Sequence, residues 1–216
     1  MIRGFQSVTV TRLELWGPET WLLCWPRSFS FLAGQVVILT LKPGGAERIF
    51  SLATGVREPE AGVLFNLVED GELTPALANL RPGDLLWVSE PFGSFPGLEG
   101  PAVWIANGTG VAPFVSMVRS GLGQQKVLIH GARKLAGFLG RQELENLPGL
   151  TYYRCCTGEA HELVFSGRLT EFLEQRSWAP SQRYLLCGSA PMIVEVRELL
   201  FRKGIPFSHI LAEVFF

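Results

Sequence analysis

The sequence is poor in the residues that bind metal ions. Its 216 residues include only 4 cysteines and 3 histidines. The cysteines stand at positions 24, 155, 156 and 187, so none forms the C-x2-C pair typical of zinc sites and iron–sulfur clusters. The histidines share no regular spacing with one another or with acidic residues, and no Ser/His/Asp arrangement for nucleophilic catalysis is evident. We therefore expect no metal site.

Long apolar runs and a strong net charge are also missing. No apolar segment approaches the ~18 residues that span a membrane, and the first residues lack the apolar core of a secretory signal peptide. The formal net charge of −1 gives no reason to expect a nucleic-acid partner. We expect a cytoplasmic protein, monomeric, that neither spans a membrane nor binds nucleic acid.

What the sequence does contain is two regions with different hydrophobic patterns. In the first, short apolar runs between Gly/Pro turns predict a six-stranded antiparallel β-barrel, with strands at residues 6–16, 21–25, 35–41, 48–53, 63–68 and 84–88. In the second, apolar runs alternate with helical patterns. This alternation predicts an α/β domain with a five-stranded parallel sheet, its strands at residues 102–106, 126–130, 151–155, 183–187 and 207–212. A Gly/Pro-rich link sets the predicted domains at residues 1–97 and 98–216.

A turn suited to phosphate follows the first predicted strand of the second domain. Gly108-Thr109-Gly110 lets the backbone turn tightly and bring N–H groups close to an anion, and the helix predicted after it would favour negative charge at its start. Gly188-Ser189 follows another predicted strand, so we expect both turns at the same carboxyl edge of the sheet. Residues 101–216 carry 12 Lys/Arg against 9 Asp/Glu, which also suits a phosphate-rich ligand.

Three motifs in a fixed order resemble those of the ferredoxin–NADP reductase superfamily. They are Arg48-Ile49-Phe50-Ser51, then Gly108-Thr109-Gly110-Val111-Ala112-Pro113, then Cys187-Gly188-Ser189-Ala190-Pro191-Met192. The resemblance runs from Arg48 to the C-terminus and is strongest with the bacterial-type ferredoxin/flavodoxin–NADP reductases. It implies an FAD-binding barrel, residues 1–97, followed by an NADP-binding α/β domain, residues 98–216.

The resemblance places the flavin on the strand that contains Arg48, Ile49, Phe50 and Ser51. Arg48 would pair with a cofactor phosphate, the ring of Phe50 would pack on the isoalloxazine, and the Ser51 hydroxyl would reach flavin N5 or O4. The family usually has tyrosine at the position of Phe50, so we expect looser flavin binding here. The alternative is a barrel strand with one exposed arginine.

A second flavin element, Glu72-Leu73-Thr74, resembles the Gly-x-Leu-Ser/Thr segment of the bacterial reductases. Thr74 is predicted to cap a helix whose N-terminus receives the FAD pyrophosphate. A capped connecting helix explains the same spacing, so this element favours FAD over FMN only through the resemblance.

The resemblance also assigns the nucleotide. Gly108, Thr109 and Gly110 would hold its phosphates, with Gly188, Ser189 and Met192 nearby. Three arginines, Arg133, Arg154 and Arg168, resemble those that bind the 2′-phosphate of NADP(H), and arginine suits the task because its planar fork meets phosphate oxygens in two places. Each of these arginines alone could equally be a solvated surface residue.

Three residues are implied to act in catalysis: Ser51, Cys187 and Glu213. Cys187 would shape and desolvate the hydride-transfer site, although a small hydrophobe ending a buried strand explains it too. Glu213 could relay protons. Phe215 and Phe216 resemble the C-terminal aromatics that cover the second flavin face in the family, and the alternative is an edge strand ending on two core phenylalanines.

The function so implied is a flavoprotein oxidoreductase that transfers a hydride between NADP(H) and FAD and single electrons between FAD and ferredoxin or flavodoxin. Two alternatives share the scaffold: the reductase component of an oxygenase and a free flavin reductase. A third, from another class, is a non-catalytic electron-transfer or regulatory subunit. The known electron-transfer partner of dihydroorotate dehydrogenase carries a cysteine cluster that this chain lacks.

Overall fold

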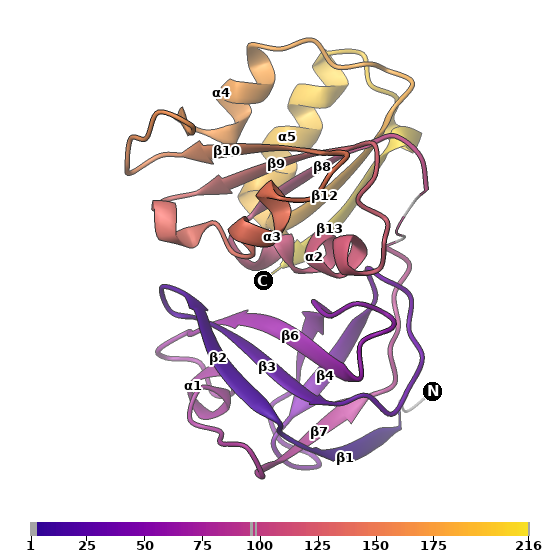
Figure 1. Cartoon of the computed structure of the whole chain (residues 1–216), viewed down its shortest axis with the longest axis vertical. Helices are drawn as coiled ribbons and strands as arrows, with labels where there is room; N and C mark the ends of the chain where they lie inside the picture. Colours follow the sequence, from indigo (N-terminus) through magenta and orange to yellow (C-terminus); the bar gives the residue numbers. More distant parts are fainter. Residues whose placement is uncertain (1–3, 96, 98, 216) are drawn as a thin grey trace. The chain divides into compact units, whose positions relative to one another are not determined.

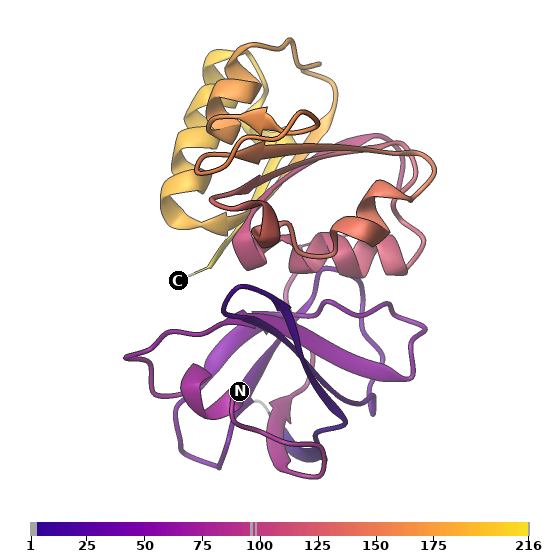
Figure 2. The same cartoon turned by 60° about the vertical axis from the view of Figure 1, so that its left-hand side comes forward.

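The computed structural model describes residues 4–95, 97 and 99–215. The chain divides into two compact units, one of Met1–Gly97 with Ala112–Ser120 and the other of Leu98–Val111 with Gly121–Phe216 (Figures 1 and 2). Each unit has its own hydrophobic core, so each is described by itself.

The described part of the first unit contains seven strands in two antiparallel sheets, of order β1-β7-β4-β5 and β2-β3-β6. An isolated bridge between Leu52 and Val63 joins the two sheets, which enclose one core. The strands are β1 (Phe5–Thr9), β2 (Arg12–Gly17), β3 (Thr20–Pro26), β4 (Val36–Thr40), β5 (Arg48–Ser51), β6 (Glu60–Asn66) and β7 (Leu85–Ser89).

The predicted count of six strands was wrong because the segment expected as one strand, residues 6–16, is two. Its backbone changes partners in the middle. The Val10 N–H donates to the Asp84 carbonyl at 2.9 Å, whereas the Thr11 N–H donates to the Cys24 carbonyl at 2.9 Å. The chain therefore leaves one sheet and enters the other at this point, and no local pattern marks the change.

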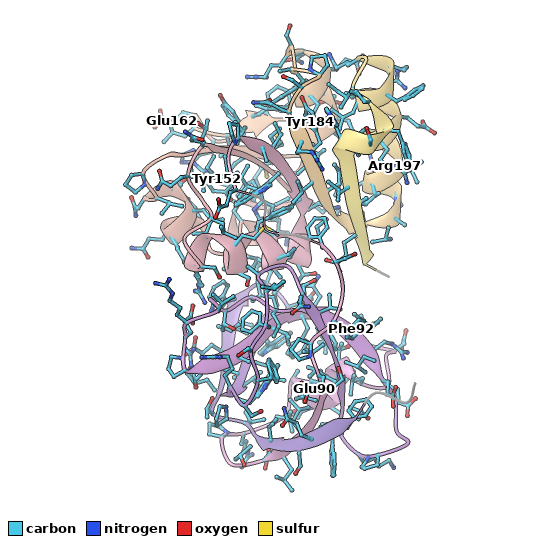
Figure 3. All side chains as sticks on the ribbon, turned by 90° about the vertical axis from the view of Figure 1, so that its right-hand side faces the viewer. Glu90, Phe92, Tyr152, Glu162, Tyr184 and Arg197 are labelled. Carbon is cyan, nitrogen blue, oxygen red and sulfur yellow. The ribbon has the colours of Figure 1, made fainter. Side chains whose placement is uncertain are left out.

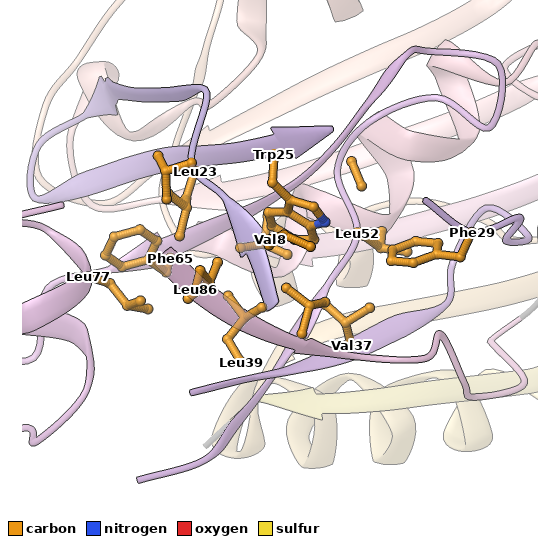
Figure 4. Close-up of a cluster of buried hydrophobic side chains, with 14 of the residues drawn as sticks. Val8, Leu23, Trp25, Phe29, Val37, Leu39, Leu52, Phe65, Leu77 and Leu86 are labelled. Carbon is orange, nitrogen blue, oxygen red and sulfur yellow. The ribbon is translucent and has the colours of Figure 1, made fainter. Parts of the chain in front are cut away.

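The core of this unit is built from the inward-facing side chains of both sheets (Figure 4). Leu23 and Trp25 of β3 and Phe65 of β6 are at most 2% exposed. The short helix α1 (Thr74–Leu77) adds Leu77, which is fully buried. Buried positions follow one another along β3 and β6, where Leu22 and Leu64 are also at most 2% exposed, so both faces of these two strands are covered.

Helix α2 (Ala112–Arg119) groups with the first unit, although the turn before it belongs to the second. Two hydrogen bonds to the segment after β5 explain this grouping. The Ser116 hydroxyl donates to the Thr54 carbonyl at 2.7 Å, and the Ser120 hydroxyl accepts from the Val56 N–H at 3.1 Å. A side chain on Gly55 would lie 2.7 Å from the Arg119 carbonyl oxygen, so the glycine permits the close approach.

The described part of the second unit contains a parallel sheet of six strands, of order β11-β10-β9-β8-β12-β13. Five strands were predicted; the sixth, the two-residue β11, pairs with Cys155 and Cys156 and is too short to be seen as an apolar run. The strands are β8 (Ala102–Asn107), β9 (Lys126–Ala132), β10 (Leu150–Cys156), β11 (Phe165–Ser166), β12 (Arg183–Ser189) and β13 (Ile210–Phe215). The last begins later than expected because Phe207–His209 forms a 3-10 turn.

Helices cover both faces of this sheet. Helices α4 (Leu169–Glu174) and α5 (Ala190–Arg202) lie on one face, and α3 (Arg141–Glu145) lies on the other (Figures 1 and 2). The adjacent Cys155 and Cys156 belong to different clusters, one on the α4–α5 side and one beside Phe138, so their side chains point to opposite faces. Within the described ranges, no helix has the length and apolar composition needed to cross a membrane.

Candidate functional site

The predicted phosphate turn and the Cys187 motif meet at one edge of the parallel sheet. Their strands, β8 and β12, are hydrogen-bonded neighbours, with Ala106 opposite Cys187. The turn itself is a 3-10 segment, Gly108–Val111, that begins where β8 ends. In parallel sheets, ligands bind at the carboxyl ends of the strands, which is where both segments lie.

The two glycines of the turn have different tasks. A Cβ on Gly110 would lie 2.3 Å from the Cys187 carbonyl oxygen and 2.6 Å from the Gly188 Cα, so only glycine allows these backbones to touch. Gly108 has a φ of +53°, and a Cβ there would meet no heavy atom within 4 Å. Gly110 therefore fixes the packing of the two segments, whereas Gly108 reverses the chain beside open space that a ligand can enter.

Asn107 joins the same two segments, and sequence analysis did not single it out. Its Nδ2 donates to the Ser189 hydroxyl at 2.9 Å, and its Oδ1 accepts from the Ser189 N–H at 2.9 Å. The signal that could have revealed it is a polar residue ending a strand that is otherwise fully buried, directly before a glycine turn.

Cys187 and Glu213 are opposite each other on the adjacent strands β12 and β13. Cys187 is fully buried, and burial, followed by the nearby Glu213 carboxylate, raises the pKa of its thiol well above the ordinary value. A thiol in this state is not a nucleophile. Met192, 7% exposed, packs its terminal methyl group against Gly188, where a Cβ would lie 2.8 Å away.

The three predicted phosphate arginines do not lie together. Ala132, Cys156 and Ser166 form a row across β9, β10 and β11, since both neighbours pair with Cys156. Arg133 and Arg168 follow this row, at the carboxyl edge, and both are exposed. Arg168 forms an ion pair with Glu195 at 3.6 Å.

Arg154, in contrast, lies inside β10, two residues before the row, and is 6% exposed. Its Nη2 pairs with the Glu145 carboxylate of α3 at 2.7 Å, and its guanidinium lies 5.7 Å from the centre of the Phe138 ring. Arg154 therefore does not stand at the strand end, because β10 continues beyond it to Cys156.

A buried histidine lies beside Arg154 on the same face of the sheet. His130 is opposite Arg154 in the β9–β10 register and is completely buried, and its Nδ1 lies 3.0 Å from the Tyr152 hydroxyl. Figure 3 labels Tyr152 in this part of the second unit. Burial lowers the pKa of His130 to about 4 and raises the pKa of Tyr152 well above its ordinary value. Both groups are therefore neutral at pH 7.

In the first unit, the predicted flavin strand is β5. Arg48 is exposed and donates to the Glu47 carbonyl at 2.8 Å, and Ile49 is 60% exposed. Phe50 is half-buried with its ring edge-on to Phe65 at 6.3 Å, and Ser51 is 2% exposed. The strand thus presents a cation and an apolar side chain to solvent.

The second predicted flavin element differs from expectation. Helix α1 has only four residues, and its N-cap is Leu73, which is 3% exposed, rather than Thr74. The Thr74 hydroxyl does not cap the helix because it accepts from the Val68 N–H at 3.0 Å. Glu72, just before the helix, is exposed.

The last predicted residues are only partly described. The backbone of Phe215 pairs with Ser189 at the end of β13, and its side chain, together with the whole of Phe216, lies outside the described residues. In the described part of the chain, no group of three or more His, Cys, Asp or Glu side chains could hold a metal ion.

The segment that contains the Gly108–Gly110 turn and the Cys187 motif matches a known protein family. The family model "Oxidoreductase NAD-binding domain" matches residues 104–198. Ferredoxin–NADP reductase B of Sorangium cellulosum is 32% identical over 218 residues, which cover 87% of this chain and 86% of that protein. The probable dihydroorotate dehydrogenase B (NAD+) electron transfer subunit of Pyrococcus abyssi is 32% identical over 171 residues, 79% of this chain but only 64% of that subunit.

The fold is also similar to that of a solved reductase structure. A ferredoxin–NADP+ reductase from Neisseria gonorrhoeae, solved with bound FAD and NADP, superposes with a TM-score of 0.90 at 20% identity and covers 98% of this chain and 99% of that one. The glycine turn against the Cys187 strand end and the match along most of the Sorangium reductase lead to one conclusion. The chain belongs to the ferredoxin–NADP reductase superfamily.

Proposed function

We propose that the chain is a flavoprotein oxidoreductase that transfers a hydride between NADP(H) and FAD and single electrons between FAD and ferredoxin or flavodoxin. One observation carries the proposal: the backbone contact of Gly110 with Cys187, which joins a phosphate-type turn to a desolvated strand end at one sheet edge. Membership of the superfamily supports it. In this proposal residues 1–97 hold FAD and residues 98–216 hold the nucleotide.

The residues at the sheet edge fit a dinucleotide. Gly108 leaves open space beside its turn, and Thr109 is half-buried next to it. The buried packing of Gly110 keeps the turn in place without any side chain in the way. These features suit the phosphates of a nucleotide, which need backbone N–H groups and room more than they need specific side chains.

The residues of β5 fit a flavin nucleotide. Arg48 offers an exposed guanidinium for a phosphate, and the half-buried ring of Phe50, on the same face of the strand, would pack on the isoalloxazine. When bound, the flavin supplies the chemistry of hydride acceptance and one-electron release. The chain supplies orientation and exclusion of water.

Two residues at the edge of the second unit would serve the hydride step through their surroundings. Cys187, fully buried and protonated, excludes water from the strand end. Glu213, opposite it on β13 and only partly buried, offers a carboxylate that can hold a proton. In this proposal Cys187 on β12 keeps water away from the reacting atoms, and Glu213 on the neighbouring strand β13 exchanges the proton.

The preference for NADP(H) over NAD(H) is proposed to rest on Arg133 and Arg168. Both are exposed at the carboxyl edge, where a 2′-phosphate could reach them, and arginine is the residue best suited to that group. Arg154 is assigned a structural role instead because its guanidinium, unlike that of Arg168, is buried as well as paired with a carboxylate.

The test is the visible spectrum of the purified protein, recorded without oxygen before and after addition of NADPH or NADH. We expect a flavin spectrum that NADPH bleaches faster than NADH, followed by reoxidation on addition of ferredoxin or flavodoxin. Analysis of the released flavin would separate FAD from FMN. A protein that takes up no flavin, even after incubation with FAD, would refute the proposal.

A second candidate is an electron-transfer subunit that works only inside a larger complex. The 32% identity to the Pyrococcus subunit favours it, and the chain matches only 64% of that subunit's length. The same spectra distinguish the two functions. A reductase passes electrons from NADPH to added ferredoxin by itself, whereas a subunit would be reduced and then transfer electrons only to its own partner.

A further inference from the structure

The side chain of Asn107 holds together the two segments that form the candidate nucleotide site. Its carboxamide makes two hydrogen bonds to one residue, Ser189: Nδ2 to the hydroxyl and Oδ1 from the N–H, both at 2.9 Å. Asn107 is separated from Ser189 by 82 positions in the sequence, so the pair is a tertiary link rather than a local turn.

The backbone of Gly188 is shaped around this carboxamide. Gly188 has a φ of +150°, and a Cβ placed on it would lie 1.9 Å from the Asn107 Oδ1. The Asn107 side chain therefore occupies the space that any side chain at position 188 would need. Because Oδ1 accepts from the N–H of the Gly188–Ser189 peptide, it also sets the direction of that peptide.

The link closes a ring of contacts. Asn107 binds Ser189, the preceding Cys187 carbonyl packs against Gly110, and Gly110 is three residues from Asn107 along the chain. Each turn is thus fixed by the other. In a closed ring of this kind, neither the phosphate turn nor the Cys187 strand end can shift without breaking two hydrogen bonds or a close backbone contact.

The hydroxyl of Ser189 does not cap the helix that begins beside it. Ser189 is the N-cap of the 13-residue helix α5, a position where serine ordinarily accepts from the first-turn N–H groups, yet its side chain makes no capping hydrogen bond. It accepts from Asn107 instead. The Ser189 hydroxyl thus helps to hold the Gly188–Ser189 turn in place, and helix α5 lacks the stabilisation that a side-chain cap would give.

We propose that Asn107 is a positioning residue that sets where the reactive end of the nucleotide lies, by locking the Cys187–Ser189 strand end to the Gly108–Gly110 turn. The proposal rests on the proposed function. Hydride transfer requires the reacting atoms about 3–3.5 Å apart, and an error of ~1 Å can cost about 100-fold in rate. Asn107 would therefore act on the rate of transfer more than on affinity.

The experiment compares Asn107→Ala with Asn146→Ala in the flavin-loaded protein. Asn146 is exposed, at the end of α3, and its amide donates only to the Gln142 carbonyl, so it controls for loss of an asparagine in the same unit. Two quantities are measured: the limiting rate of flavin reduction at saturating NADPH, and the Kd of 2′-phospho-AMP, which lacks the nicotinamide half. For Asn107→Ala we expect the rate to fall roughly 10- to 100-fold and the Kd to change less than about threefold.

A conservative variant separates positioning from simple loss of stability. Asn107→Asp keeps both hydrogen bonds, because its second oxygen can accept from the Ser189 hydroxyl. We expect it to recover most of the rate while weakening 2′-phospho-AMP through its added negative charge. A rate in Asn107→Ala equal to that of Asn146→Ala, or no recovery in Asn107→Asp, would overturn the role. A wild-type protein that no reduced nucleotide bleaches would instead refute the proposed function, and this role with it.

Discussion

The carboxyl edge of the parallel sheet has two halves that are built differently. At β8 and β12, contacts are made by backbone and by one short side chain: Gly110 against Cys187, and Asn107 on Ser189. At β9, β10 and β11, the features are long side chains, with Arg133 and Arg168 exposed and Arg154 paired with Glu145 beneath them.

The half at β8 and β12 is therefore rigid, and the half at β9, β10 and β11 is adjustable. A Cβ on Gly110 would lie 2.3 Å from the Cys187 carbonyl oxygen, so no larger residue fits there. An exposed arginine, in contrast, can move or be replaced without disturbing the fold. The rigid half suits the reacting end of a ligand, whose position must be held closely. The adjustable half suits the end that selects between similar ligands.

The largest effect is expected at Gly110. A methyl group there must push the Cys187 backbone aside, so Gly110→Ala should lower the free energy of unfolding by about 3 kcal/mol. Gly108→Ala is the matched control: its Cβ would be unobstructed, and its φ of +53° alone should cost about 1 kcal/mol. Urea unfolding measures both. Equal losses for the two variants would remove the argument that the backbone contact is rigid.

The next effect concerns the buried polar residues below the arginines. His130 stays neutral in the folded protein down to its pKa of about 4, whereas the unfolded chain binds a proton below about 6.5. The stability that neutral His130 contributes is therefore complete above pH 6.5 and is lost as the pH falls toward 4, by about 3 kcal/mol. Unfolding free energies of wild type and His130→Gln between pH 4 and 7 measure this difference. Parallel pH profiles for the two proteins would contradict it.

Arg154 distinguishes a structural arginine from a ligand-binding one. Arg154→Ala removes a buried guanidinium and its pair, while Glu145 can be partly solvated, so we expect a loss of about 2 kcal/mol in stability. The ratio of the Kd values for NADPH and NADH should stay unchanged. If the variant were stable but no longer preferred NADPH, Arg154 would have to be counted among the residues that bind the 2′-phosphate.

The smallest effect on the fold, and the largest on ligand choice, is expected at the exposed arginines. Arg133→Ala and Arg168→Ala should each weaken NADPH by about 10-fold, the size of one charge-assisted hydrogen bond, and leave NADH and the melting temperature nearly unchanged. Isothermal titration of both nucleotides measures this. Arg197→Ala on α5, labelled in Figure 3, is the control, since its guanidinium lies over the Phe207 ring. Equal weakening of NADPH and NADH would remove the 2′-phosphate assignment.

The contrast also explains how far the sequence could be read. The glycine turn, the Cys187 motif and the parallel strands could be predicted because backbone turns need glycine and buried strands need apolar runs. The division at Val10 and Thr11 could not, because it depends on which strand each N–H finds across the barrel. The prediction that Thr74 caps a helix was wrong because the Thr74 hydroxyl accepts a hydrogen bond from the Val68 N–H, outside the helix.

Long side chains were the least predictable. Arg154 and Arg168 look alike in the sequence, and only the length of β10 and the position of Glu145 on α3 make one buried and the other exposed. Asn107 was missed for a related reason. Its partner Ser189 is far away in the sequence and comes close only because β8 and β12 are neighbours in the sheet.

The contrast between the rigid and adjustable halves of the sheet edge can be tested by recording backbone amide resonances of the protein during titration with NADP+. We expect shifts at the two turns of the rigid half, Gly108–Gly110 and Cys187–Ser189, and at Arg133 and Arg168, with none at Glu174 and Glu198, which line the groove between α4 and α5. Shifts confined to that groove, or spread evenly over the chain, would contradict it.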